Sequence, residues 1–220
     1  MYTKHKWQSD VHYNFGYVKY LPKDFDESKR YPLVFFLHGA GERGDDLDVA
    51  MRHGYMKHVR ESGQEYPFIF IAPQCPQGKI WGCYTESLLA FLDYICDTLP
   101  VDRDRVYLTG LSMGGTGSWM LAMAAPERFA ALVPVCGSGI YWCGGALTEI
   151  PIYIYHGDCD EVVPIGNSIE MLTSVNKRGG HAQIKILYGV KHNAWDAAYS
   201  DDELLSWLLQ QKRTCRENGQ

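Results

Sequence analysis

The sequence predicts an α/β fold, in which a mostly parallel central sheet carries helices on both faces. Two apolar runs, 33–37 and 68–72, lack polar alternation, which is typical of strands covered on both faces. A helical pattern of apolar residues at 88–99 separates the second run from a third, at 106–109. Strand and helix patterns then alternate to residue 211, as in repeated strand-helix-strand units.

The remaining elements follow in order along the chain. An extended aromatic strand at 11–20 comes before the first buried run. After the third run we expect a helix at 115–124, strands at 131–136 and 152–155, a helix at 165–177, a strand at 183–187 and a last helix at 201–211. In open parallel sheets functional residues gather at the carboxyl ends of the strands. The chemistry is therefore expected at one edge of the sheet.

Length and composition favour a single globular domain spanning residues 1–220. The chain has 46% hydrophobic and 21% charged residues, without repeats or low-complexity tracts. Its net charge of -5 and its scattered basic residues give no footprint for binding phosphates. Only the tail gathers basic residues, at Lys212, Arg213 and Arg216. We expect no nucleic-acid partner, and the sequence gives no oligomeric state.

The first 20 residues show no secretory pattern, and no segment approaches the roughly 20 apolar residues of a membrane span. A cytoplasmic protein without a membrane partner is expected. The seven cysteines are odd in number and form no C-x-x-C pair, which favours free thiols over a disulfide framework or a zinc site. One bridge among Cys136, Cys143 and Cys159 stays open. The cysteines are Cys75, Cys83, Cys96, Cys136, Cys143, Cys159 and Cys215.

The candidate nucleophile is Ser112, in the pentapeptide Gly110-Leu111-Ser112-Met113-Gly114. A G-x-S-x-G motif alone occurs often by chance, so its position carries the inference. The strand at 106–109 runs directly into it and a helix follows it, which places Ser112 on a sharp strand-to-helix turn. Glycines suit positions 110 and 114 because side chains there would collide with neighbouring backbone. The alternative is that Ser112 merely caps the helix.

A serine hydroxyl needs a base, and the base needs an acid to hold its tautomer. With a nucleophile of this kind the chain order is serine, acid, histidine, which leaves His181 and His192 as bases. They flank the strand at 183–187 and would lie about 20 Å apart, since a strand rises about 3.3 Å per residue. Only His192 follows the carboxyl end. The acid candidates after the strand at 152–155 are Asp158, Asp160 and Glu161, which spacing does not separate.

Several stretches together resemble compact esterases of the α/β-hydrolase superfamily, in the branch of feruloyl and other carbohydrate esterases and polyhydroxybutyrate-depolymerase-like proteins, often labelled predicted peptidases. The resemblance covers most of the chain. It rests on residues 38–44, Ala72-Pro73-Gln74, residues 101–115, His156-Gly157-x-x-Asp160-x-x-Val163-Pro164 and His192-Asn193-x-Trp195. It implies an α/β-hydrolase fold, and the length of the chain predicts a minimal lid or none.

The resemblance also implies site residues. The acid is the aspartate of H-G-x-x-D-x-x-V-P, which falls on Asp160, with Asp158 as the alternative. The oxyanion hole falls on the backbone N-H groups of Met113 and Ala40, with Gly41 as the alternative to Ala40. Fixed donors at such a point stabilise the charge that develops on the carbonyl oxygen.

Three further residues of the loop at 38–44 are candidates for roles beyond the oxyanion hole. His38 is expected to be structural rather than a second base. Glu42 and Arg43 are expected to pair with each other within the loop, with contact between Arg43 and substrate as the alternative.

With little chain left for a lid, we expect an open, shallow site that suits short or aromatic acyl esters, on small molecules or saccharides, better than long-chain lipids. Aromatic walls suit such groups. Trp81, Trp142 and Trp195 are the candidate substrate-binding residues, with loop packing as the alternative. The predicted reaction is two-step acyl transfer by a serine esterase, without metal or cofactor. A serine peptidase and an inactive binding module of the same fold are the other hypotheses.

Overall fold

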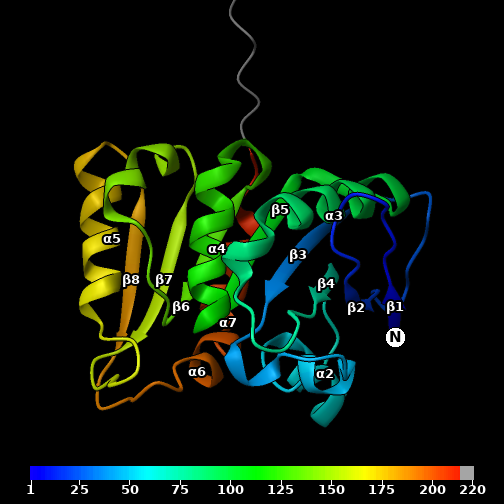
Figure 1. Cartoon of the computed structure of the whole chain (residues 1–220), viewed down its shortest axis with the longest axis horizontal. Helices are drawn as coiled ribbons and strands as arrows, with labels where there is room; N and C mark the ends of the chain where they lie inside the picture. The colour runs from blue at the N-terminus through cyan, green and yellow to red at the C-terminus, as the bar shows by residue number, and fades with distance from the viewer. Residues whose placement is uncertain (214–220) are drawn as a thin grey trace, which may run out of the picture.

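The computed structural model describes residues 1–213, and these residues contain one eight-stranded sheet (Figure 1). The strand order is β1-β2-β4-β3-β5-β6-β7-β8. The first two neighbour pairs, β1 with β2 and β2 with β4, are antiparallel, and all later pairs are parallel. The strands are β1 (Tyr2–Lys6), β2 (Gly16–Tyr20), β3 (Tyr31–Leu37), β4 (Ile69–Pro73), β5 (Val101–Leu111), β6 (Ala131–Val135), β7 (Ile152–Gly157) and β8 (Ala182–Leu187). The mostly parallel sheet is as predicted.

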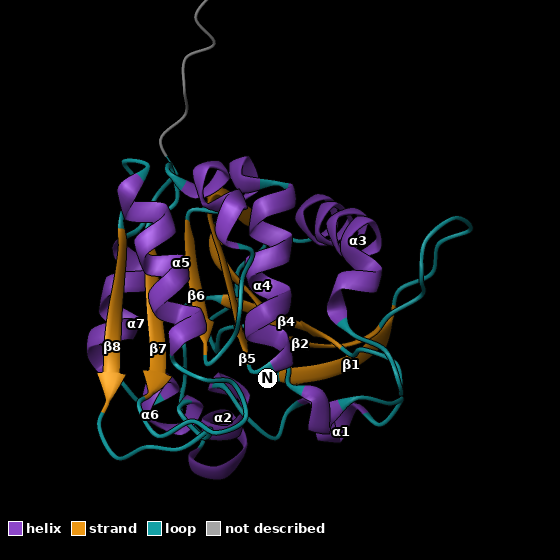
Figure 2. Ribbon diagram, turned by 60° about the vertical axis from the view of Figure 1, so that its left-hand side comes forward, coloured by secondary structure: helices purple, strands orange, loops and turns teal. Residues whose placement is uncertain are grey.

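Helices cover both faces of this sheet (Figure 2). Leu33, Phe35 and Leu37 of β3 pack into one core and Val34 and Phe36 into the other, which is the alternation of a strand buried on both sides. The first core takes in side chains of α3 (Thr85–Thr98), α4 (Met113–Ala124) and α5 (Gly166–Lys177). The second takes in side chains of α2 (Tyr55–Ser62), α6 (Trp195–Tyr199) and α7 (Asp202–Gln210).

The amino-terminal strand differs from the prediction. Residues 11–15 lie in a loop between β1 and β2, which is closed by a hydrogen bond from the Trp7 N-H to the Phe15 carbonyl. Phe15 is fully buried and its ring contacts that of Phe91 on α3. The aromatic residues that suggested a strand therefore serve to pack this loop onto a helix.

Two other differences concern length and short helices. Strand β5 begins at Val101 rather than at 106. Val101 already pairs with Tyr31 of β3, and the pairing of the two strands is irregular between Tyr31 and Leu33. Residues 47–62 carried no predicted element and form α1 (Leu47–Ala50) and α2. Short 3-10 turns, also not predicted, are η1 (Ala40–Glu42), η2 (Trp81–Tyr84), η3 (Pro126–Arg128) and η4 (Tyr141–Leu147).

Among residues 1–213 no helix combines the length and apolar character needed to cross a bilayer. The six cysteines in this part of the chain, from Cys75 to Cys159, are all free, so no bridge joins Cys136, Cys143 and Cys159. Cys215 and Arg216 lie outside the described residues. The single-domain span of 1–220 stays a prediction.

Candidate active site

The turn between β5 and α4 holds Ser112 in a conformation that non-glycine residues rarely adopt. Its φ is 54° and its ψ is -117°. Backbone in such regions costs on the order of 1–3 kcal/mol and persists where the surroundings enforce it. The side chain makes no capping hydrogen bond to the helix, so the helix-cap alternative is wrong. Ser112 lies on the sharp turn that the sequence predicted.

Two glycines make this turn possible. A Cβ at Gly110 would lie 2.3 Å from the Gly114 carbonyl oxygen, and a Cβ at Gly114 would lie 1.8 Å from that of Leu37. Neither distance allows a side chain, since carbon contacts normally begin near 3.5 Å. The steric role predicted for both glycines is confirmed.

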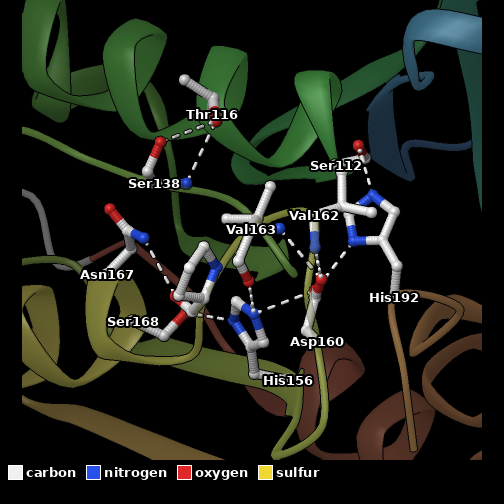
Figure 3. A network of polar contacts seen from close by, with 11 residues as sticks. Ser112, Thr116, Ser138, His156, Asp160, Val162, Val163, Asn167, Ser168 and His192 are labelled. Carbon is white, nitrogen blue, oxygen red and sulfur yellow. Dashed lines mark hydrogen bonds and ion pairs between the residues drawn. The ribbon is translucent and has the colours of Figure 1, made fainter.

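Ser112, His192 and Asp160 form a continuous chain of hydrogen bonds (Figure 3). The Ser112 Oγ lies 2.8 Å from His192 Nε2, and His192 Nδ1 lies 2.7 Å from Asp160 Oδ2. The three residues follow β5, β8 and β7, at the carboxyl edge of the sheet. The structure thus brings together the three residues that the sequence analysis grouped, although they are up to 80 positions apart.

The Asp160 side chain is fully buried, yet it is well supplied with donors. Its Oδ1 accepts the backbone N-H groups of Val162 and Val163, both at 2.9 Å. Burial raises the pKa of Asp160, but the hydrogen bonds from His192 and these two N-H groups outweigh it and hold that pKa below its usual range. Asp160 is therefore ionised at neutral pH. The proton between it and His192 belongs on Nδ1, which leaves Nε2 free to accept the hydroxyl proton of Ser112.

The alternative residues have other positions. Asp158 is exposed and its Oδ1 accepts the N-H of Gly189, so it holds the turn after β8. Glu161 is exposed as well. His181 precedes β8, at the opposite end of that strand from His192, and is exposed. Asp160 and His192 are the residues in contact.

The loop after β3 carries the predicted second donor. Ala40 is the first residue of η1 and Met113 the first of α4, and the first N-H groups of a helix have no acceptor within it. His38 supports this loop: its Nδ1-H donates to the Gly39 carbonyl at 2.7 Å, and its Nε2 accepts the Cys75 N-H at 3.0 Å. The Gly39 carbonyl shares a peptide plane with the Ala40 N-H, so His38 fixes the direction of that donor. Its structural assignment is consistent with these contacts.

A family model described as "alpha/beta hydrolase fold" matches residues 32–145, which is more than half of the chain. The chain belongs to the α/β-hydrolase fold family. This agrees with the eight-stranded sheet and with the serine at the strand-to-helix turn.

Curated relatives of this α/β hydrolase include feruloyl esterases. It is 30% identical over 167 residues to a probable feruloyl esterase C of Aspergillus terreus, covering 74% of this chain and 62% of the relative. It is also 30% identical over 172 residues to feruloyl esterase C of Emericella nidulans, with the same two coverages. The chain thus spans less than two thirds of the length of these relatives.

Solved structures give the same fold. A thermostable esterase superposes with a TM-score of 0.86 at 32% identity, covering 96% of this chain and 63% of the esterase. The feruloyl esterase module of Clostridium thermocellum, solved in complex with sinapinate, has a TM-score of 0.77 at 12% identity and coverages of 100% and 91%. At that identity the second likeness concerns the fold alone.

Two of the three tryptophans predicted to bind substrate do not lie at the site of this α/β hydrolase. Trp81 is 1% exposed and its Nε1-H donates to the His38 carbonyl, so the prediction for it is wrong: it packs the loop from within the core. Trp142 is 80% exposed and lies on η4. The neighbouring Tyr141 carbonyl accepts a hydrogen bond from Ser174, which lies near the carboxyl end of α5. Because α5 begins at the active-site edge, Trp142 lies toward the opposite edge, and the prediction for it is wrong as well.

Trp195 does contact the hydrogen-bonded chain. Its ring meets that of His192 edge to face at a centroid distance of 5.3 Å, and meets that of His53 at 5.4 Å. It is half-buried, and its Nε1 is buried without a hydrogen-bond partner. Of the three tryptophans predicted to bind substrate, Trp195 is thus the one whose ring contacts a residue of the hydrogen-bonded chain.

The predicted pairing of Glu42 with Arg43 is wrong. Arg43 donates instead to the carbonyls of Ala40 and Lys79, and thereby ties the loop after β3 to the segment before η2. Glu42 is buried and its carboxylate lies 3.7 Å from His53 Nε2. Both side chains hold the loop through residues elsewhere in the chain, Arg43 through Lys79 and Glu42 through His53. The adjacency of positions 42 and 43 in the sequence does not reveal these partners.

Two further residues beside Asp160 were not assigned by the sequence. Cys136 is fully buried with a φ of 41°, and its Sγ lies with ligand atoms of Asp160 and His192, all within 4.8 Å of one another. Because Asp160 and His192 already share a proton, a cation at this point would displace that proton. The second residue is His156, which contacts Asp160 from the opposite side. Its place in H-G-x-x-D, at the end of an apolar strand, was the available signal.

Proposed function

We propose that this α/β hydrolase is a serine carboxylesterase that cleaves short-chain or aromatic, feruloyl-like acyl esters, including those on plant saccharides. The observation that carries the proposal is the unbroken chain Ser112-His192-Asp160, with bonds of 2.8 and 2.7 Å, at a strained strand-to-helix turn. A binding module would have no need to keep this geometry. The names of the curated feruloyl esterases support the aromatic acyl class.

The geometry supports a two-step acyl transfer. His192 Nε2 takes the proton of Ser112 as the Oγ attacks the ester carbonyl, and ionised Asp160 stabilises the imidazolium that forms. The N-H groups of Ala40 and Met113 are the proposed donors to the oxyanion. His192 then protonates the leaving alcohol. Water repeats the cycle on the acyl-enzyme and restores Ser112, so the reaction balances without a further reactant.

The test is hydrolysis of p-nitrophenyl acetate, butyrate and longer acyl esters beside methyl ferulate. Ser112→Ala should lower kcat/KM by at least about a thousandfold. Asp160→Asn should lower it by about 10⁴-fold, since the acid sets the tautomer of the base. Asp158→Asn is the matched control and should retain activity, because that carboxylate bonds a turn. Failure of the parent protein to hydrolyse any of these esters would refute the proposal.

Measuring anilide and ester substrates side by side separates an esterase from a peptidase, because an amine is a poorer leaving group than an alcohol. Faster hydrolysis of the anilide would favour the peptidase.

A cytoplasmic location also stays a proposal, supported by the odd number of cysteines and the free thiols of the described residues. Cell fractionation would check it.

A further inference from the structure

His156 is a buried polar residue to which the proposed reaction gives no part. It lies at the carboxyl end of β7, and its side chain is fully inaccessible to solvent. A buried imidazole must find partners for both ring nitrogens, since an unpaired polar group costs about 1–3 kcal/mol. Its partners therefore show what it does.

The two ring nitrogens have different partners (Figure 3). Nε2 lies 2.7 Å from the Val163 carbonyl oxygen and 3.2 Å from Asp160 Oδ2. Both are acceptors, because the carboxylate is ionised, so Nε2 must carry a proton. Nδ1 lies 2.7 Å from the hydroxyl of Ser168, which can donate to it. One N-H group of His156 is thus shared between the loop after β7 and the acid.

The contact completes the surroundings of the carboxylate. Oδ1 is held by the N-H groups of Val162 and Val163, and Oδ2 faces both His192 and His156. Rotation of the carboxylate about its Cβ-Cγ bond would break contacts at both oxygens. The same His156 N-H holds the Val163 carbonyl, and so holds the segment that supplies the two N-H groups.

We propose that His156 is a positioning residue for the acid, whose Nε2-H fixes the Asp160 carboxylate and the 162–163 segment so that Oδ2 faces His192. This inference rests on the proposed esterase function. His156 does not touch the serine or the substrate; it acts through Asp160. Its loss should therefore lower kcat and leave KM unchanged.

A matched pair of variants tests this role. In His156→Gln the amide nitrogen reaches the former position of Nε2 and carries two hydrogens, one for each acceptor. In His156→Asn the amide is one methylene shorter and reaches only the position of Nδ1. We expect the Asn variant to lose about tenfold in kcat, the scale of one hydrogen bond to a charged group, and the Gln variant to stay within about threefold of the parent. Asn and Gln variants with equal kcat would overturn the proposal.

A double-mutant cycle with Asp160→Asn separates positioning from a general structural role. If His156 acts through the acid, His156→Asn should cause less than about a twofold further loss in that background. A full tenfold loss in both backgrounds would overturn the proposal.

The rate at which a fluorophosphonate labels Ser112 gives a second readout that needs no substrate. It should fall in His156→Asn and be retained in His156→Gln. A parent protein that labels but hydrolyses no ester would count against the proposed function alone, and the labelling rates would still decide the role of His156. A parent that hydrolyses esters, with a His156→Asn variant of undiminished kcat and labelling rate, would count against this inference alone.

Discussion

Gly114→Ala should damage both stability and activity, whereas the chemically identical change Gly166→Ala should do neither. A Cβ at Gly114 would lie 1.8 Å from the Leu37 carbonyl oxygen and 2.4 Å from its carbonyl carbon. Both partners are backbone, so α4 and β3 would have to separate by about 1.5 Å to reach an ordinary contact. Overpacking usually costs 1–3 kcal/mol and more where backbone must move, so we expect a loss of about 3 kcal/mol. The separation would also draw Met113 away from the loop after β3.

Gly166 is the matched control because it opens α5 and has nothing within 4 Å of its Cβ position. Thermal unfolding followed by circular dichroism should show Tm lowered by about 6–12 °C in Gly114→Ala, at about 2–4 °C per kcal/mol for a chain of this length. Tm should be unchanged or slightly raised in Gly166→Ala. Turnover of p-nitrophenyl acetate should fall only in the first variant. A Gly114→Ala protein with parental Tm and kcat/KM would refute the reasoning.

Three other predictions follow from burial. Burial lowers the pKa of His38 from 6.5 to about 4, so the unfolded state binds more protons than the folded state between these pH values. The free energy of unfolding should therefore fall by about 3 kcal/mol from pH 6.5 to 4. Urea titrations should show a shallower fall for His38→Gln. An equal fall in both proteins would contradict this. Burial also raises the pKa of the Cys136 thiol to about 12, so iodoacetamide at pH 8 should leave this thiol unmodified and should modify the exposed Cys83 and Cys143, as peptide mapping would check. Labelled Cys136 in the folded protein would be inconsistent with its burial. Trp142→Ala should leave kcat and KM unchanged, and Trp195→Ala should lower kcat/KM about tenfold through its contact with His192; equal effects would argue against the positions assigned here.

The sheet and the contact between Ser112 and His192 were predictable because both follow from rules about strand patterns and strand ends. Buried parallel strands form continuous apolar runs, and the ends of such strands meet at one edge. That was enough to choose His192 over His181. Asp160 needed the family resemblance, because Asp158 sits two positions away with the same chemistry and differs only in the direction of its side chain.

The aromatic residues were not predictable, because a loop that follows a strand can run toward the site or away from it. The segments that carry Trp81 and Trp142 both come after strands at the active-site edge, as Trp195 does. One turns into the core and the other runs back along α5. These directions depend on contacts with distant partners, such as the His38 carbonyl and Ser174, and periodicity contains no information about them.

The proposed base, His192, and the proposed nucleophile, Ser112, follow strands that differ in how well they are protected from solvent. Ser112 follows β5, which has neighbours on both sides, whereas His192 follows β8, one of the two edge strands, whose residues are half-buried or exposed. Local opening of a protein begins where few buried contacts resist it. Fraying of this single edge would remove the base while the core around Ser112 stays folded. Turnover measured on this molecule would therefore also report whether the edge strand β8 is intact.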